Sequence, residues 1–203
     1  IGAQDAYGTY VWKGIPFAAP PVDDLRWRAP APTANWEGRL EALSFASQCP
    51  QMQQGSPERL GSEDCLYLNV WTPILSKVPS GAERLPVMVW IHGGGNSVGS
   101  AHTRFYNGAW LAGEHNVIVV SIHYRLGPLG WFRHPALADD ATSSADASGN
   151  FGTLDIVSSL EWVKHNIAAF GGNPDNVTIF GESAGGFNVL SMMASPLADG
   201  LFH

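Results

Sequence analysis

A serine between two glycines is the residue of this chain best suited to act as a nucleophile. Ser183 stands in Gly181-Glu182-Ser183-Ala184-Gly185, directly after the apolar run at residues 177–180. A strand that turns into a helix through Gly-x-Ser-x-Gly exposes the serine hydroxyl on a sharp, strained bend. We expect Gly181 and Gly185 to be required there, because a Cβ atom would collide. The pattern predicts covalent acyl transfer; an ordinary glycine-rich turn is the alternative.

A second glycine-rich turn could bind the negative charge that acyl transfer develops. His92-Gly93-Gly94-Gly95 follows the apolar run at residues 85–91. Backbone N–H groups in such a turn can point at a substrate oxygen, and losing one such donor typically costs about 3–4 kcal/mol of activation free energy. The start of a helix after Ser183 would add further N–H groups and a partial positive charge. Two halves of one reaction centre, each at a strand end, favour catalysis.

The elements that would position these turns follow from the hydrophobic pattern. Residues 87–91 and 117–122 are apolar on both faces, which suits the centre of a mostly parallel sheet, and residues 66–71 alternate like a strand. Apolar residues at steps of four and three predict a helix over residues 154–170, which Gly171-Gly172 ends. Shorter helices are expected at residues 107–112 and 187–193. This order of elements predicts a doubly wound α/β fold, with the ligand beyond the carboxyl ends of the strands.

Composition narrows the class of protein. The chain has 203 residues, of which 45% are apolar and 14% are charged, so one substantial core is expected. The net charge of −7 argues against nucleic acid or an anionic membrane surface as a partner. No apolar run reaches the length of a membrane span, and residues 1–5 do not have the character of a signal peptide.

The two cysteines, Cys49 and Cys65, flank a polar, loop-like segment. A disulfide that closed this loop would stabilise the fold by roughly 3 kcal/mol in the chain-entropy model. The alternative is a pair of unbonded, small apolar side chains. A disulfide would indicate an oxidising compartment, so a secreted or periplasmic location is expected. The spacing fits no zinc pattern, and no metal or organic cofactor is predicted.

Several long motifs, in a fixed order, cover nearly the whole chain. They are Ser62 to Pro73, His92 to Gly95, Tyr124 to Gly127, and the stretch from Gly149 through Phe170-Gly171-Gly172-Asn173-Pro174 to Ser183. With these motifs the chain resembles the type B carboxylesterase/lipase family of α/β-hydrolases, which includes the cholinesterases. The resemblance implies an α/β-hydrolase fold of which this chain would be the N-terminal portion. It also implies hydrolysis of small-molecule carboxylic esters.

The resemblance also implies roles for individual residues. Ser183 would be the nucleophile, and the backbone N–H groups of Gly94, Gly95 and Ala184 would form the oxyanion hole. Cys49 and Cys65 would form a disulfide under the active-site gorge. Glu63 and Arg125 would form a structural ion pair, with two solvated charges as the alternative. The three-glycine turn resembles oxyanion loops that leave room for esters of bulky, even tertiary, alcohols.

Three positions depart from the family pattern. Asn96 follows the glycines where relatives often have an aromatic or small apolar residue, so we expect it in the pocket and expect an altered acyl or alcohol preference. His123 stands where asparagine is usual and could alter a buried hydrogen bond. Gly55 occupies the place of the choline-binding tryptophan of cholinesterases, so a quaternary-ammonium substrate is disfavoured.

The sequence offers no convincing general base for Ser183. A serine hydroxyl needs a base, and the base needs an orienting acid. His92 is expected to be structural, His165 to be solvated, and Glu182 to be a pocket wall or a buried, hydrogen-bonded acid. The remaining histidines lie in polar stretches or at the end of the chain, namely His102, His115, His134 and His203.

In the family, the acid and the histidine follow the serine far downstream. Residues 1–203 are therefore expected to be a single α/β-hydrolase domain that is incomplete at its C-terminal side. A companion chain or a C-terminal continuation would then complete it. The two alternatives to an active esterase are a non-catalytic binding or adhesion module on the same fold and an inactive fragment. The intact serine turn and glycine turn favour the enzyme.

Overall fold

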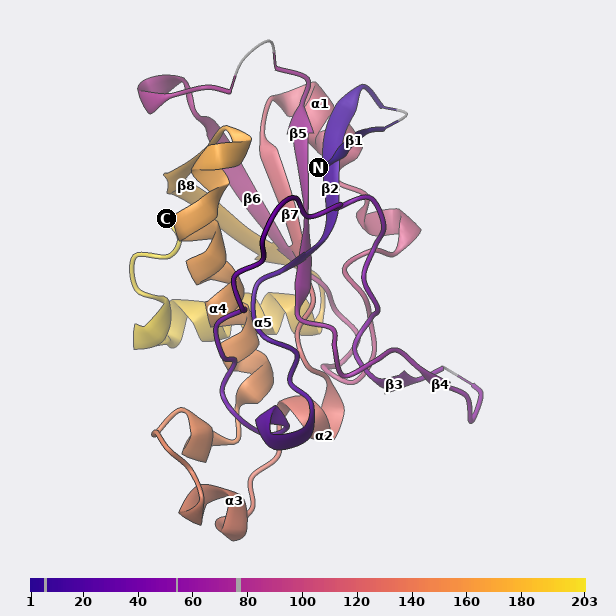
Figure 1. Ribbon diagram of the computed structural model, residues 1–203, viewed down its shortest axis with the longest axis vertical. Coiled ribbons are helices and arrows are strands. Elements are labelled where there is room, and N and C mark those ends of the chain that lie inside the picture. The colour runs from indigo at the N-terminus through magenta and orange to yellow at the C-terminus, as the bar shows by residue number, and fades with distance from the viewer. Residues whose placement is uncertain (6, 54, 76–77) are drawn as a thin grey trace.

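The computed structural model describes residues 1–5, 7–53, 55–75 and 78–203, and it is built around one six-stranded sheet (Figure 1). The strand order is β1-β2-β5-β7-β6-β8, and a separate hairpin pairs β3 with β4. The strands are β1 Ala3–Gln4, β2 Thr9–Pro16, β3 Gln51–Met52, β4 Arg59–Leu60, β5 Tyr67–Pro73, β6 Leu85–Ile91, β7 Ile118–Ile122 and β8 Gly172–Gly181.

Four of the six strands in the main sheet run in the same direction. β6 pairs in parallel with both β7 and β8, whereas the pairs β1–β2, β2–β5 and β5–β7 are antiparallel. β2, β6, β7 and β8 therefore point the same way, and the expected mostly parallel sheet with flanking helices is confirmed. In the β6–β8 register, Ile91 lies opposite Gly181. The turns that follow β6 and β8 consequently leave the sheet at the same level.

Each predicted helix is present, with shifted ends. The α-helices are α1 Ala109–His115, α2 Gly127–Gly130, α3 Pro135–Asp139, α4 Phe151–Asn166 and α5 Ala184–Ala194. The 3₁₀-helices are Asp23–Leu25, Gly81–Glu83, Arg104–Tyr106, Asp146–Ser148, Ile167–Phe170 and Pro196–Ala198. The helix predicted over residues 154–170 begins three residues earlier, and its last turn is a 3₁₀-helix that ends at Gly171, whose φ is +87°. Helix ends commonly tighten in this way.

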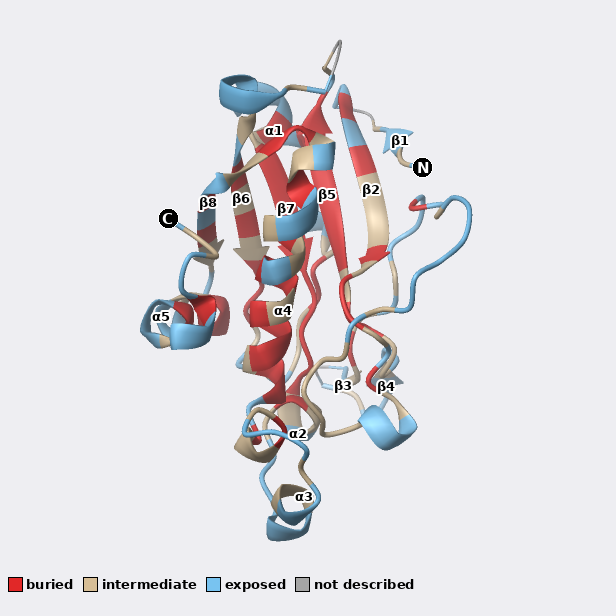
Figure 2. Ribbon diagram, turned by 60° about the vertical axis from the view of Figure 1, so that its left-hand side comes forward, coloured by how far each residue is buried: buried red, intermediate tan, exposed pale blue. Residues whose placement is uncertain are grey.

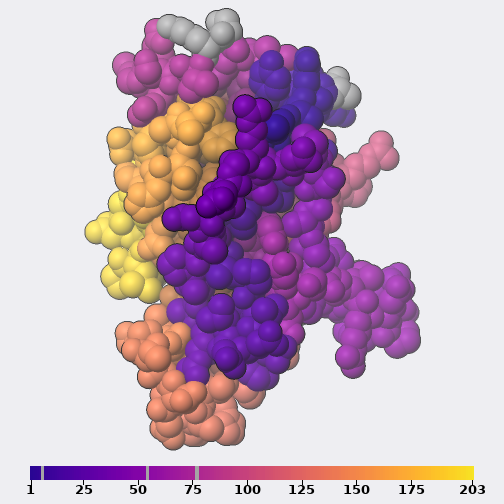
Figure 3. All heavy atoms as spheres, viewed as in Figure 1, coloured from indigo at the N-terminus to yellow at the C-terminus, as the bar shows by residue number. Residues whose placement is uncertain are grey.

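The main core lies between the sheet and the layer formed by α4 and α5. The buried side chains of α4 include Ile156 and Leu160, which belong to one cluster with Val89 and Val120 of the sheet. Figure 2 shows the buried face of α4 lying along the central strands. The N-terminal segment contributes Ile15 and Phe17 to the same cluster, and Figure 3 shows residues of this segment spread across that side of the molecule.

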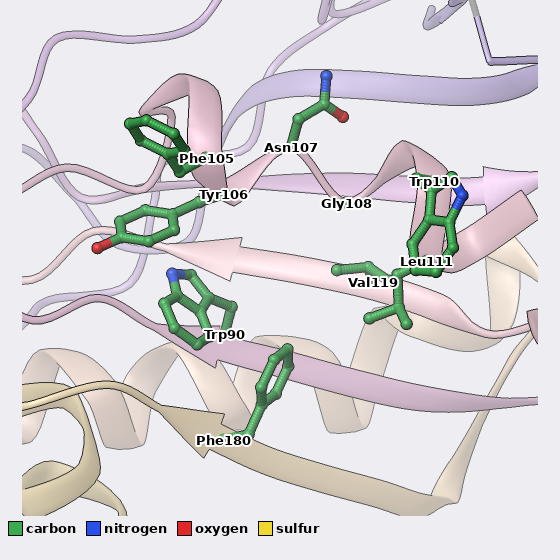
Figure 4. Close-up of a pocket in the computed structure, with 9 residues that line it drawn as sticks. All are labelled: Trp90, Phe105, Tyr106, Asn107, Gly108, Trp110, Leu111, Val119 and Phe180. Carbon is green, nitrogen blue, oxygen red and sulfur yellow. The ribbon is translucent and has the colours of Figure 1, made fainter.

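The opposite face of the sheet is only partly covered. α1 packs there through Ala109 and Ala112, against Trp71 and Val119. Beyond α1, Trp90 and Phe180 leave a hollow of about 260 Å³, which Figure 4 shows in close-up. The residues that line it are Trp90, Phe105, Tyr106, Asn107, Gly108, Trp110, Leu111, Val119 and Phe180. In the part of the chain that the structure describes, no helix combines the length and apolarity that crossing a membrane requires.

Candidate active site

The backbone at Ser183 is strained. This residue joins the end of β8 to the start of α5. Its φ of 55° and ψ of −121° are a backbone conformation that residues other than glycine rarely adopt. Such a conformation costs on the order of 1–3 kcal/mol and persists only where the surroundings enforce it. The side chain is solvent-exposed, although the residues that follow it, Ala184 and Gly185, are buried. The bend therefore presents the serine hydroxyl to solvent, as the sequence pattern predicts.

Two glycines allow this bend to fit against β6. A Cβ atom at Gly181 would lie 2.5 Å from the carbonyl carbon of Gly185. A Cβ atom at Gly185 would lie only 2.0 Å from the carbonyl oxygen of Ile91. Both distances are far below a van der Waals contact, so the expectation that these two positions require glycine is confirmed.

The glycine turn after β6 contacts the serine turn directly. A Cβ atom at Gly93 would lie 3.1 Å from the Cβ of Ser183 and 2.6 Å from the carbonyl oxygen of Glu182. Gly94 and Gly95 both have positive φ, of 107° and 62°, which glycine adopts at little cost. The two turns, which lie ninety positions apart in the sequence, therefore form one structural unit.

Within the part of the chain that the structure describes, three backbone N–H groups at this unit have no partner. Within the described residues, no carbonyl or side-chain oxygen accepts a hydrogen bond from the N–H of Gly94, Gly95 or Ala184. Turn closure uses other groups, since the carbonyl of Gly94 accepts from the N–H groups of Ser97 and Val98 at 3.1 and 3.0 Å. Unpaired donors beside an exposed hydroxyl are chemically suited to bind a developing oxyanion.

No described side chain is placed to act as the base. Among residues 1–5, 7–53, 55–75 and 78–203, no histidine or carboxylate hydrogen-bonds the Ser183 hydroxyl. His165 is exposed on α4, as expected, and His203 lies beside Val177 of β8. Glu182 is exposed, so the alternative of a buried acid is wrong, whereas its role as a pocket wall stays a prediction; its Oε2 would lie 2.6 Å from a Cβ atom at Gly93. Its carboxylate therefore lies along the glycine turn.

His92 is a buried structural residue. Its ring stacks on Tyr124 with centroids 4.4 Å apart, and its Nδ1 lies 2.8 Å from the carbonyl oxygen of Gly93. Burial is the main cause that lowers the pKa of His92 to about 4. The imidazole is therefore neutral near pH 7 and supports the turn. The hydroxyl of Tyr124 donates to the carbonyl oxygen of His92 at 2.6 Å.

His123 belongs to the same buried region. Its Nε2 lies 3.3 Å from the hydroxyl of Ser100, and its ring lies 5.3 Å from that of His102. Burial lowers the pKa of His123 well below its ordinary value, and the neighbouring His92 and His102 lower it further. The buried hydrogen bond that the structure shows at this position is therefore the one between His123 and Ser100.

The expected ion pair between Glu63 and Arg125 is wrong, because each residue has another partner. Arg125 donates to Asp155 of α4 from its backbone N–H, its Nε and its Nη2, at 2.9, 2.8 and 2.7 Å. Both side chains are almost completely buried. Glu63 instead accepts two hydrogen bonds, at 2.6 and 2.7 Å, from Arg26 of the N-terminal segment. Asp155 was missed, although an acid between Leu154 and Ile156 in an apolar helix pattern is a signal for a buried pair.

The other two sites that the sequence singled out are located as follows. Cys49 and Cys65 are joined by a disulfide, as expected. Asn96 has a φ of 55°, and its side-chain oxygen accepts a hydrogen bond of 3.0 Å from the buried amide of Asn188 on α5. Asn188 was not identified from the sequence, although it is a polar residue in a mostly apolar helical run.

Comparison with known proteins places these features in a family context. The model of the carboxylesterase family matches residues 2–203. The chain is 46% identical to the fumonisin B1 esterase of Sphingopyxis macrogoltabida over 94% of its length, and 46% identical to the para-nitrobenzyl esterase of Bacillus subtilis over 97%. It is 45% identical to human cocaine esterase over 97%. The chain spans 34%, 39% and 35% of the lengths of these three relatives.

Solved esterase structures have the same fold. A PNB esterase superposes with a TM-score of 0.85 at 45% identity, over 99% of this chain and 40% of that one. A Geobacillus stearothermophilus carboxylesterase gives a TM-score of 0.85 at 42% identity, over 100% and 40%. The α/β-hydrolase fold, of which this chain forms the N-terminal portion, is therefore confirmed.

Replacing Gly185 by alanine should destabilise the protein far more than the same change at the next residue. The Gly185→Ala side chain must displace the Ile91 carbonyl, and such overpacking typically costs about 1–3 kcal/mol or more. At Gly186 the nearest atom to a new Cβ lies at 3.5 Å, so Gly186→Ala should be neutral or stabilising by up to about 1 kcal/mol. Urea unfolding of both variants measures the difference, and equal midpoints would contradict the close contact.

Acid should weaken the fold through the buried imidazoles. Below pH 6.5 the unfolded chain binds a proton at His92, whereas the folded chain leaves it neutral down to about pH 4, so stability falls as the pH falls through this window. By pH 5 the loss from His92 alone is about 2 kcal/mol. Urea unfolding at pH 7.5 and 5.0 measures it. The variant His123→Gln removes a second imidazole whose pKa burial lowers, so it should flatten the pH dependence. A slope identical to that of the unmodified protein would refute the assignment.

Proposed function

We propose that this chain, which belongs to the carboxylesterase family, carries the nucleophile and the oxyanion-binding amides of a serine carboxylic-ester hydrolase. One observation carries the proposal. Ser183 is exposed on a strained bend that contacts the glycine turn, and no partner among the described residues pairs with the N–H groups of Gly94, Gly95 and Ala184. The relatives named above are all called esterases, which supports an ester as the substrate.

The proposed reaction has two steps. The Ser183 oxygen attacks the carbonyl carbon of the ester while a histidine removes the hydroxyl proton. The three N–H groups stabilise the negative charge on the carbonyl oxygen of the tetrahedral intermediate. This intermediate expels the alcohol, which takes the proton from the histidine, and an acyl-enzyme remains. Water then attacks the acyl group and releases the acid, and Ser183 regains its proton. None of these steps calls for a metal ion or an organic cofactor.

We assign the histidine and its orienting acid to a C-terminal continuation or a companion chain. Residues 1–203 would then be one α/β-hydrolase domain that is incomplete at its C-terminal side, and inactive by itself. Two features support the assignment. First, β8 is an edge strand that pairs with β6 on one side. Second, Phe187, Leu190 and Met193 of α5 are 72%, 59% and 68% exposed and form one apolar stripe along the helix. Such surfaces are normally covered in a folded protein.

We further propose a secreted or periplasmic location. Cys49 and Cys65 form a disulfide, and disulfides persist in oxidising compartments but are rare in reducing ones.

Gly55 stands at the position where cholinesterases would have their choline-binding tryptophan. It is exposed, and no atom lies within 4 Å of the place where a Cβ would be. The substrate is therefore proposed to be an ester without a quaternary ammonium group.

Ser183 should be the residue that reacts with a fluorophosphonate or sulfonyl fluoride in the complete protein, and mass spectrometry of the labelled peptides locates it. Ser183→Ala should lower kcat for a short-chain aryl ester by at least about 10⁴-fold, because the covalent step is lost. Ser191→Ala is the matched control, since this exposed serine lies two turns later on α5. Labelling elsewhere, or full activity of Ser183→Ala, would refute the mechanism.

The isolated residues 1–203 should associate, because β8 and the apolar stripe of α5 are uncovered. Size-exclusion chromatography with light scattering, combined with intact mass, measures the species present. We expect oligomers, aggregates or a complex with a further polypeptide. A stable, monodisperse species of 21.8 kDa would contradict the proposal of a missing partner or continuation.

A further inference from the structure

Asn96 connects the glycine turn to two other parts of the protein. It directly follows Gly95, and its own backbone is left-handed, a conformation that asparagine tolerates better than most residues. Its carbonyl oxygen accepts a hydrogen bond of 2.6 Å from the N–H of Gly127 at the start of α2. Its side-chain oxygen accepts one of 3.0 Å from the amide of Asn188 on α5. The carbonyl oxygen and the side-chain oxygen of Asn96 therefore both accept a hydrogen bond from another part of the protein.

Asn188 lies on the helix that begins at the nucleophile. It is five residues after Ser183 and is only 4% exposed, so its amide needs partners within the protein. Its amide donates to the side-chain oxygen of Asn96 at 3.0 Å, so Asn188 reaches the end of the glycine turn through Asn96.

This geometry links the two sources of N–H donors. Gly94 and Gly95 belong to the turn, whereas Ala184 is the first residue of α5. Donors for one oxygen must lie about 2.7–3.1 Å from the position that it occupies in the transition state, so the distance between turn and helix must be fixed. Backbone contacts at Gly93 and Gly185 bring the turn and the helix start together, but glycine contributes no side chain that would hold them in that position. The hydrogen bond between Asn96 and Asn188 is a side-chain link that joins the residue after the turn to α5.

We propose that Asn96 and Asn188 form a positioning clamp that holds the glycine turn at the correct distance from the start of α5. The inference rests on the proposed ester hydrolysis and adds to it two residues that do not touch the substrate. It also revises the expectation that Asn96 acts on acyl or alcohol preference by lining the pocket. A clamp acts on the transition state, in which the oxyanion exists, and leaves ground-state binding of the ester unchanged.

The test uses the complete protein and three variants. Asn188→Ala removes the donor while keeping a good helix former, Asn96→Gly removes the acceptor while keeping the left-handed backbone accessible, and the third variant combines both. We expect each single variant to lower kcat for a short-chain aryl ester about 10-fold with KM within twofold. Inhibition by a trifluoromethyl ketone, whose hemiketal oxygen occupies the oxyanion position, should weaken by the same factor. The double variant should lose about 10-fold rather than 100-fold, because one bond is removed in all three.

Matched controls separate the clamp from general effects. Asn166 has a side-chain hydrogen bond to the carbonyl of Trp162 at the exposed end of α4, and Asn166→Ala should change neither kcat nor inhibition. Circular dichroism establishes which variants are folded. If Asn188→Ala fails to fold, Asn96→Gly carries the test, since it removes only a half-buried side chain.

The outcomes are distinguishable. Unchanged kcat and inhibition in the folded variants, a change in KM alone, or a 100-fold loss in the double variant would each overturn the clamp while leaving the proposed function intact. Absence of turnover by the unmodified complete protein would instead overturn the proposed function, and the clamp with it.

Discussion

Backbone packed directly against backbone is the constraint on which the candidate site depends. The carbonyl oxygen of Ile91 occupies the space that a side chain at Gly185 would need, and a Cβ atom at Gly93 would lie 2.6 Å from the carbonyl oxygen of Glu182. Side chains usually keep the backbones of neighbouring segments apart. Glycine has no side chain, so the backbones of these two turns come into direct contact. Parallel pairing of β6 with β8 brings the two strand ends level, and the glycines let the two turns merge into one unit. The strain at Ser183 is sustained by this contact and by the helix that begins directly after it.

Buried polar groups fix the loops around that unit. Arg125, three residues after β7, is held by three hydrogen bonds to Asp155, which ties the end of the sheet to α4. Breaking such a pair leaves an uncompensated buried charge, which is why both partners tend to be retained together. His92 and Tyr124 stack beneath the glycine turn in neutral form. The turn therefore rests on an uncharged base.

The sequence predicted the parts of this protein that depend on local pattern. Strands β6, β7 and β8, helix α4 and the serine bend follow from apolar periodicity and from the placement of glycine. The partners of long-range polar contacts could not be obtained in that way. Glu63 and Arg125 were paired by resemblance, whereas the fold brings Arg26 to one and Asp155 to the other. A charge pattern shows that a residue needs a partner, but only tertiary structure shows which segment supplies it. Asn188 was missed for the same reason.

The parallel pairing of β6 with β8 has a consequence for the order of folding. Ile91 and Gly181 meet although they lie ninety positions apart in the sequence, and contacts of such long range form slowly because a large loop must close first. During synthesis from the ribosome, the earlier strands emerge long before β8, so Ser183 adopts its strained backbone only after β8 has docked beside β6. A nascent or partly unfolded chain therefore presents Ser183 without this bend. The strained bend is a property of the docked pair of strands, and residues 181–185 alone do not encode it.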